Sequence, residues 1–183
     1  KEIVVTVVNL NTELAEFKSS NDCDYDDLVD WIWASANAPV FMTLLKKDGF
    51  EYVDGGIVEH IPIQEAINKG ATDIDVIIHR PEEYSKIKTY QSKNIIDMFL
   101  RIIDIMHKEV SKNDVAISKL RALDEDVTIK IYYTPYKLSS NSLMFNKSSM
   151  NKWWDLGYNS IKDKSCSIET FNLSKDNTIK KII

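Results

Sequence analysis

The hydrophobic pattern along the chain alternates between short β-branched runs and longer amphipathic stretches. Ile3–Val8 and Ile74–Ile78 are nearly continuous apolar runs, a pattern typical of strands buried on both faces, as in a parallel sheet. Val127–Tyr133 alternates apolar and polar positions and is predicted to be a strand with one buried face. Thr12–Lys18 alternates in part, so we expect it to pair back on the first run as a hairpin.

Amphipathic stretches between these runs predict helices. Lys93–Val110 is the strongest, because its apolar residues recur on one stripe and its charged residues on the opposite face. We expect Ser111–Leu123 to continue as another helix and Ser148–Ile161 to form the last one. A shorter helix is expected to begin at Asp24 or Asp26, whose carboxylate can accept free amides of the first turn. Strands alternating with helices predict an α/β fold with a layered sheet.

Composition narrows the class of protein. The 183 residues fit one domain or part of a larger one, and the net charge of −5 argues against a nucleic-acid partner, which would need a basic face. Cys23 and Cys166 lie far apart and have neither metal-binding nor redox spacing. We expect free thiols in a reducing compartment, the cytoplasm, although one long-range disulfide stays open. No apolar run approaches the ~20 residues that span a membrane.

The chain begins at Lys1 and runs almost directly into its first predicted strand. We expect it to be a piece of a longer polypeptide, with the N-terminal part of the domain missing. A processed mature start is the alternative.

Phe50–Val53 is predicted to be a short strand that delivers Asp54. Asp54 is followed by two adjacent glycines, Gly55 and Gly56, in a chain with only five glycines. The pair indicates a backbone geometry that a side chain would forbid, with the Asp54 carboxylate presented at a rigid bend. The alternative is an ordinary glycine turn with an incidental aspartate.

Other candidate residues carry weaker signals. The chain contains neither a G-x-S-x-G nucleophile motif nor a glycine-rich phosphate loop. His60, His79 and His107 share no metal-ligand spacing, and only His60, six residues after Asp54, is expected near that acid. Ser35 has no visible base, so we interpret it as a packing residue.

The tryptophan pair Trp153 and Trp154 admits two interpretations, lipid contact and core packing. For one of the two we favour packing, because such a helix usually buries at least one tryptophan.

Several features in order resemble the C-terminal half of a patatin-like phospholipase domain. Small residues ending in a proline (ASANAP, Ala34–Pro39) precede an aromatic residue, and GFEYVDGGIVEHIPIQEAINKGATDIDVI follows at Gly49–Ile77. Within that stretch the similar features are Asp54-Gly55-Gly56, Ile61-Pro62, Ala66 and Gly70. The opening Ile3–Phe17 and the later Leu143–Phe145 and Leu156–Tyr158 also look similar. One departure is Ile61, where the family often has asparagine.

The resemblance covers residues 1–162 as the C-terminal part of such a domain and leaves residues 163–183 as a tail. It implies a three-layer α/β/α fold with a mainly parallel sheet. It also implies ester hydrolysis by a serine/aspartate dyad, with Asp54 as the base and Gly55 and Gly56 supporting its turn. Phospholipid or another fatty-acyl ester would be the substrate, with transient contact to a membrane surface. No cofactor or metal is implied.

The serine motif and the oxyanion loop of the family are not in these 183 residues. We therefore expect this chain to supply the aspartate and a segment outside it to supply the serine, so that the chain alone is inactive. One alternative is a non-catalytic lipid- or protein-binding domain that has lost the serine. Another is a stand-alone regulatory α/β domain.

Overall fold

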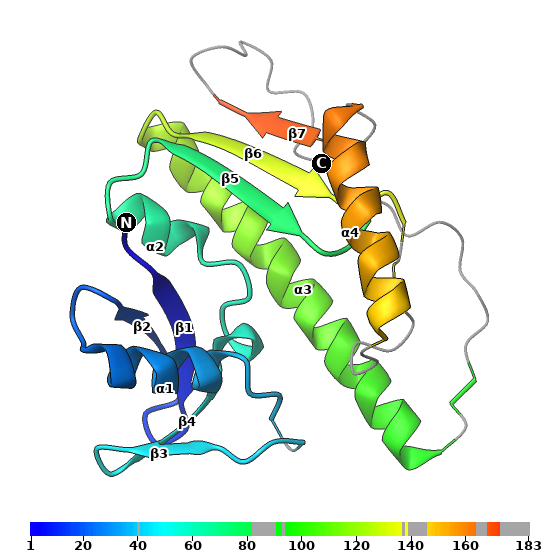
Figure 1. Ribbon diagram of the computed structural model, residues 1–183. Helices are drawn as coiled ribbons and strands as arrows, with labels where there is room; N and C mark the ends of the chain where they lie inside the picture. Colours follow the sequence, from blue (N-terminus) through cyan, green and yellow to red (C-terminus); the bar gives the residue numbers. More distant parts are fainter. Residues whose placement is uncertain are drawn as a thin grey trace. The chain divides into compact units, whose positions relative to one another are not determined.

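The computed structural model describes residues 1–39, 41–81, 91–92, 94–136, 138, 146–163 and 168–172 (Figure 1). The chain divides into two compact units. Unit 1 comprises Lys1–Gly70 with Ser92–Arg121, and unit 2 comprises Ala71–Gln91 with Ala122–Ile183.

Unit 1 is built on a four-stranded sheet of order β2-β1-β4-β3. Its strands are β1 (Val4–Asn9), β2 (Leu14–Ser19), β3 (Leu45–Lys47) and β4 (Phe50–Asp54). Its helices are α1 (Tyr25–Ser35), the short 3-10 helix η1 (Gly55–Ile57), α2 (Ile63–Asn68) and nearly all of α3 (Ile95–Asp124). Every strand pair in this sheet is antiparallel.

The β1–β2 hairpin forms as its sequence predicts. Asn9 ends β1, and its Oδ1 accepts the amides of Asn11 and Thr12 at 3.0 and 3.3 Å, which closes the turn. Glu13 then takes a positive φ of 62° before β2 begins. The turn therefore places the positive φ on a glutamate and not on a glycine.

Helix α1 begins at Asp24, whose Oδ1 accepts the amide of Asp27 at 2.9 Å, as expected for an N-cap. The helix buries Trp31 and Ala34 against Val7 and Tyr52. The rings of Trp31 and Tyr52 meet edge to face, with centroids 4.9 Å apart. This cluster is the hydrophobic core between α1 and the strands β1 and β4.

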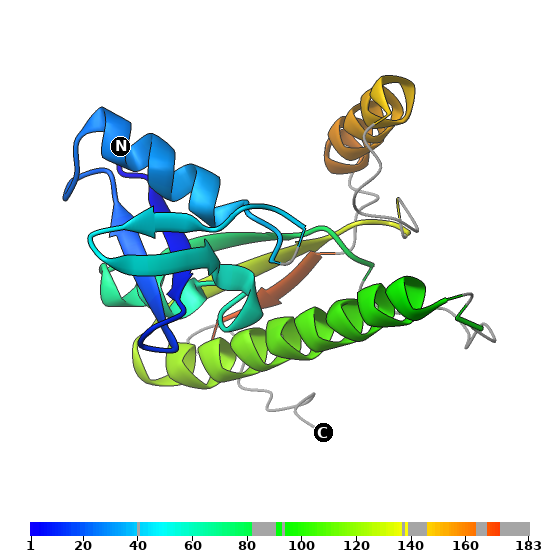
Figure 2. The ribbon, with the colours of Figure 1, turned by 90° about the horizontal axis from the view of Figure 1, so that it is seen from below.

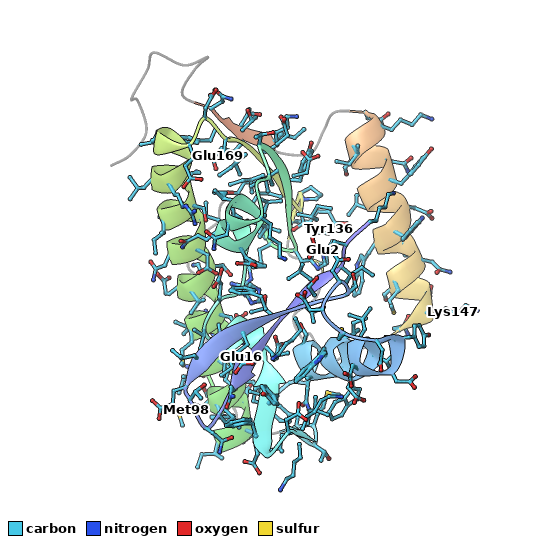
Figure 3. The ribbon with its side chains drawn as sticks, turned by 90° about the vertical axis from the view of Figure 1, so that its left-hand side faces the viewer. Glu2, Glu16, Met98, Tyr136, Lys147 and Glu169 are labelled. Carbon is cyan, nitrogen blue, oxygen red and sulfur yellow. The ribbon has the colours of Figure 1, made fainter. Side chains whose placement is uncertain are left out.

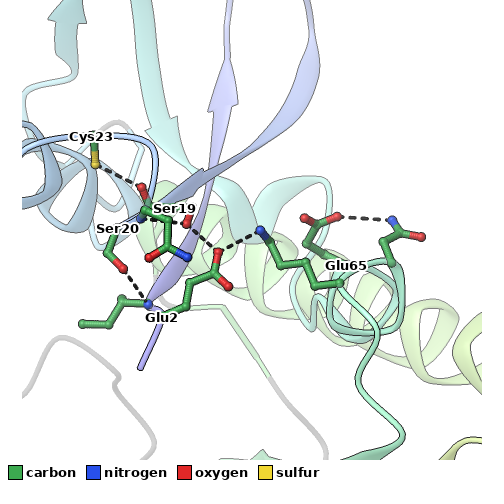
Figure 4. A network of polar contacts seen from close by, with 9 residues as sticks. Glu2, Ser19, Ser20, Cys23 and Glu65 are labelled. Carbon is green, nitrogen blue, oxygen red and sulfur yellow. Dashed lines mark hydrogen bonds and ion pairs between the residues drawn. The ribbon is translucent and has the colours of Figure 1, made fainter.

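Polar contacts fix the start of β1 (Figure 4). The Ile3 amide donates to Ser20 Oγ at 3.0 Å, and Glu2 accepts from Lys69 Nζ at 2.8 Å. Cys23 is a free thiol and lies 3.1 Å from the Ser19 carbonyl oxygen. The first residues of the chain are therefore tied both to the end of β2 and to the residue after α2.

Unit 2 contains a three-stranded sheet of order β5-β6-β7 (Figure 2). Its elements are β5 (Asp73–Ile78), β6 (Thr128–Tyr133), β7 (Ile168–Phe171) and α4 (Lys147–Lys162). β5 and β6 pair in parallel, whereas β6 and β7 pair antiparallel. Ile129 and Ile131 of β6 are fully buried. The strand β7 lies within residues 163–183, the stretch expected to be a tail.

The α/β class is confirmed, but the prediction of a mainly parallel sheet is wrong for the described strands. Only β5 and β6 are parallel, among five described pairings. The connections explain this. Tight turns join β1 to β2 and β3 to β4, and strands joined so closely pair antiparallel, because a parallel pair needs a long crossover. The chain between β5 and β6 is long and includes α3, as a parallel pair requires.

Helix α3 is one continuous helix of 30 residues rather than two consecutive ones. Its predicted buried stripe is largely exposed: Ile95 is 77% and Met106 57% exposed, and Met98 is exposed as well (Figure 3). Nevertheless, none of the described helices combines the length and apolar character that crossing a membrane requires.

In α4, the two adjacent tryptophans differ in burial. Trp154 is 78% exposed, whereas Trp153 is partly buried. The expected core role is therefore met in part by Trp153. Leu143–Phe145, which contributed to the family resemblance, lies outside the described residues.

Candidate active site

Asp54 is the last residue of β4 and lies opposite Val7 of β1. It caps the 3-10 helix η1, because its Oδ1 accepts the Gly56 amide at 2.8 Å. Its own amide donates to the Asn37 carbonyl oxygen at 3.3 Å. Contacts on both sides of the residue therefore fix the direction of a partly buried carboxylate.

A glycine is required at Gly55 because a side chain would have no room there, and not because of an unusual φ. A Cβ placed on it would lie 2.5 Å from Thr6 Cγ2 and 2.6 Å from both the carbonyl carbon and oxygen of Thr6. These distances are far below van der Waals contact, and two of the three atoms are backbone. The chain therefore passes directly over β1 as it leaves β4, which no other residue type allows without moving the strand.

Gly56 lies where two polar side chains meet. A Cβ on this glycine would stand 2.8 Å from His60 Nδ1 and 3.3 Å from Asp54 Oδ1. His60 is thus brought close to Asp54, as its position six residues downstream suggested. The missing side chain of Gly56 therefore leaves room for the imidazole and the carboxylate to lie close together.

A cleft of about 300 Å³ opens at this turn. Asp54, Glu59 and His60 line it together with Ser35 from the end of α1. The other lining residues are Val4, Val5, Thr6, Gly56 and Pro62. The cleft therefore combines two carboxylates, an imidazole and a hydroxyl on a largely aliphatic wall.

The small-residue run before Pro39 packs behind this turn. Asn37 is fully buried; its carbonyl accepts the Asp54 amide, and its Nδ2 donates to the Thr43 carbonyl oxygen. Ala34 is also fully buried, in the core cluster. The order of ASANAP and D-G-G in the sequence thus corresponds to a direct backbone contact.

Asp114 of α3 holds the segment after the turn. Its Oδ2 accepts the amides of His60 and Ile61 at 2.8 and 2.9 Å. The His60 ring also stacks on His107 of α3, with centroids 5.4 Å apart. His107 is partly buried, and its ring lies against that of His60.

Two carboxyl groups near this segment have altered acidity. Burial raises the pKa of Glu59 above its ordinary value, and the charges of Asp114 and Glu65 raise it further. Burial also raises the pKa of Asp114, against the lowering effect of the two backbone amides and of His60. These two carboxyl groups are therefore less acidic than in water.

Sequence reasoning identified Asp54, Gly55 and Gly56 and the neighbourhood of His60, but missed Glu59 and Asp114. Glu59 falls inside the motif and could have been noticed as a carboxylate five residues from Asp54. Asp114 carried no signal, since it lies on a helix surface 54 residues from His60 in sequence.

Two weaker candidates from the sequence lie in different units. Ser35, interpreted as a packing residue, lines the cleft. His79 follows β5 in unit 2 and is exposed.

The described residues contain no group of three or more histidine, cysteine, aspartate or glutamate side chains arranged to hold a metal ion. The polar groups of the cleft can accept and donate protons. Their arrangement therefore suits acid–base chemistry.

Comparison with known proteins gives one result for this region. No curated protein matches the chain. Residues 1–67 match the family model described as Patatin-like phospholipase. This stretch includes β1 to β4, the whole Asp54 turn and α2 up to Ile67. The resemblance to patatin-like phospholipases, a family of lipid hydrolases, is therefore confirmed for this part of the chain.

Proposed function

We propose that this chain supplies the general base of a patatin-like serine acyl hydrolase that acts on phospholipids or related fatty-acyl esters. The observation that carries the proposal is the position of Asp54. It stands at the edge of a cleft, its carboxylate is oriented by the Gly56 amide, and it lies within the stretch that matches the lipid-hydrolase family. The Gly56 amide binds Oδ1, and in the proposed reaction Oδ2 accepts the proton.

The serine comes from outside these residues, because the sequence contains no G-x-S-x-G motif. In the proposed reaction the serine oxygen attacks the ester carbonyl carbon while Asp54 accepts the proton of the serine hydroxyl. Collapse of the tetrahedral intermediate breaks the ester bond, and Asp54 returns the proton to the departing alcohol. Water then attacks the acyl-serine, again giving a proton to Asp54, and the fatty acid leaves as the serine recovers its hydrogen.

We further propose that residues 1–162 form the C-terminal part of the hydrolase domain and residues 163–183 its tail. In the complete domain, strands from the preceding segment would extend the sheet toward a three-layer α/β/α arrangement. The reaction would take place in the cytoplasm, with transient contact between protein and membrane surface. The reaction needs no cofactor or metal in this scheme, since the proton acceptor is a carboxylate.

Turnover of a chromogenic fatty-acyl ester tests the proposal. The isolated chain should neither turn over the ester nor be labelled by a fluorophosphonate, a reagent for activated serines. Joined to the polypeptide that carries G-x-S-x-G, it should do both. Turnover by the isolated chain that Asp54→Ala abolishes would overturn the proposal. Loss of that turnover in Ser35→Ala would then identify Ser35 as the nucleophile.

The alternative is a domain that binds lipid or protein without hydrolysis. The exposed apolar residues of α3, Ile95 and Met106 among them, are the observation in its favour. This function predicts that the chain sediments with phosphatidylcholine vesicles, and that the polypeptide encoded upstream carries a degenerate G-x-S-x-G. An intact motif there, with turnover by the joined protein, favours the hydrolase.

A further inference from the structure

Three residues of α3 spaced seven apart contact the segment that follows the Asp54 turn. His107 stacks on the His60 ring, Asp114 accepts the amides of His60 and Ile61, and Arg121 Nη1 lies 3.4 Å from the Gln64 carbonyl oxygen. Residues seven apart lie on nearly the same face of a helix, two turns from one another. One stripe of α3 therefore follows the chain from the turn into α2.

Asp114 makes the strongest contact of this stripe. Both amides donate to the same oxygen, Oδ2, at 2.8 and 2.9 Å, and the carboxylate is partly buried. Hydrogen bonds to an ionised acceptor are about twice as strong as neutral ones, and partial burial strengthens them further. Two consecutive peptide groups are thus fixed in direction by a side chain from a distant helix.

Fixing these peptide groups also fixes the His60 side chain. Its backbone is held by Asp114, its ring rests on His107, and Nδ1 points to the place beside Gly56 where Asp54 Oδ1 also lies. The titratable groups that face His60 here are Asp54, His107 and Asp114, with Glu59 next to it in sequence. Movement of the His60 backbone would change what the Asp54 carboxylate faces.

We propose that Asp114 is a positioning residue for Asp54, acting through the His60–Ile61 backbone and the His60 ring. The proposal rests on the role of Asp54 as the base. Asp114 itself lies outside residues 1–67, the part of the chain that matches the family. The helix that follows the matched region would therefore contribute to the proton-transfer site without touching the substrate.

Nuclear magnetic resonance on the full 183-residue chain tests this without requiring hydrolysis. In Asp114→Ala the amides of His60 and Ile61 should exchange with solvent about tenfold faster. The Gly56 amide donates to Asp54 Oδ1, so its exchange reports how firmly that carboxylate is held. It should also exchange faster in Asp114→Ala, because the displaced His60 ring no longer lies beside Gly56 and Asp54.

Two variants make the result specific. Asp114→Asn keeps an oxygen acceptor, so it should restore much of the protection of the His60, Ile61 and Gly56 amides. It replaces the alanine variant if that variant fails to fold. Glu109→Ala removes an exposed carboxylate of the same helix, paired with Lys112, and should leave both readouts unchanged.

The outcomes separate this inference from the proposed function. Faster exchange at His60 and Ile61 with unchanged exchange at Gly56 would reduce Asp114 to a structural anchor and overturn the inference. Unchanged exchange at all three amides would overturn it as well. Faster exchange at Gly56 supports it even if the joined protein hydrolyses no ester, a result that would count against the proposed function alone.

Discussion

β4 is bounded at both ends by the same dipeptide, Asp-Gly, and the two copies are used in different ways. Asp48-Gly49 precedes the strand, with positive φ values of 53° and 80°, and nothing lies within 4 Å of where a Cβ of Gly49 would be. This is an ordinary two-residue hairpin turn in which glycine supplies conformation. At the other end, Gly55 supplies space, because Thr6 occupies the volume of any side chain.

The comparison separates a turn from a site. Asp48 joins two strands at the surface, whereas Asp54 is held by the Gly56 amide at the edge of a cleft. The dipeptide therefore carries no functional meaning by itself. What distinguishes Asp54 is that other elements, β1 and the segment held by α3, are packed around its turn.

The largest expected difference between the two aspartates is in activity. In the joined hydrolase, Asp54→Asn should lower kcat by about 10²–10⁴-fold, because an amide cannot accept the serine proton. Asp48→Asn is the matched control and should leave kcat unchanged, since asparagine tolerates a positive φ. Steady-state hydrolysis of a fatty-acyl ester measures both. Equal losses in the two variants would remove the functional distinction between the turns.

The next difference is in stability. Gly55→Ala should lower the free energy of unfolding by about 3 kcal/mol, because the new methyl group meets the Thr6 backbone. Gly49→Ala should cost only about 1–2 kcal/mol, through its positive φ. Urea unfolding measures both values.

A second substitution sharpens the stability test. Thr6→Ser removes Cγ2 but leaves the carbonyl group, so it should not rescue Gly55→Ala. Full rescue would mean that the contact involves only the Thr6 side chain.

Gly56→Ala should have a smaller effect on stability, about 1 kcal/mol, because its methyl group meets only the ends of the His60 and Asp54 side chains. Moving His60 away should relieve it, so His60→Ala combined with Gly56→Ala is expected to recover most of the loss. Thermal unfolding of the single and double variants checks this. Additive losses would show that the two residues do not share this space.

The smallest effect concerns the pH dependence of folding. The raised pKa of Glu59 means that its contribution to stability is fully present below the unfolded pKa and is lost as pH rises through the folded value. Glu59→Gln should therefore raise stability slightly at neutral pH, with the gain disappearing in acid.

Glu109→Gln should have the opposite effect on stability: a loss at neutral pH that disappears in acid. The hydrogen bond from Lys112 lowers the pKa of Glu109, so its contribution is present at neutral pH and lost in acid. Unfolding midpoints measured at several pH values compare the two. The same sign in both variants would contradict the burial of Glu59.

Local features of the fold were predictable from sequence. The β1–β2 hairpin, the Asp24 cap of α1 and the strand that delivers Asp54 depend on residues close together in the chain. The parallel sheet was mispredicted because β-branched runs report burial and not strand direction. Direction depends on the connections, and two of these are tight turns.

The sequence by itself determined that an aspartate would end β4 at a rigid glycine turn, because turn and strand preferences act over a few residues. Only the tertiary structure decided why the glycines are there and what surrounds the acid. The Gly55 requirement comes from Thr6, and the His60 segment is held by Asp114, 54 residues away. Steric contact and hydrogen bonding act between neighbours in space, and folding brings these distant residues together.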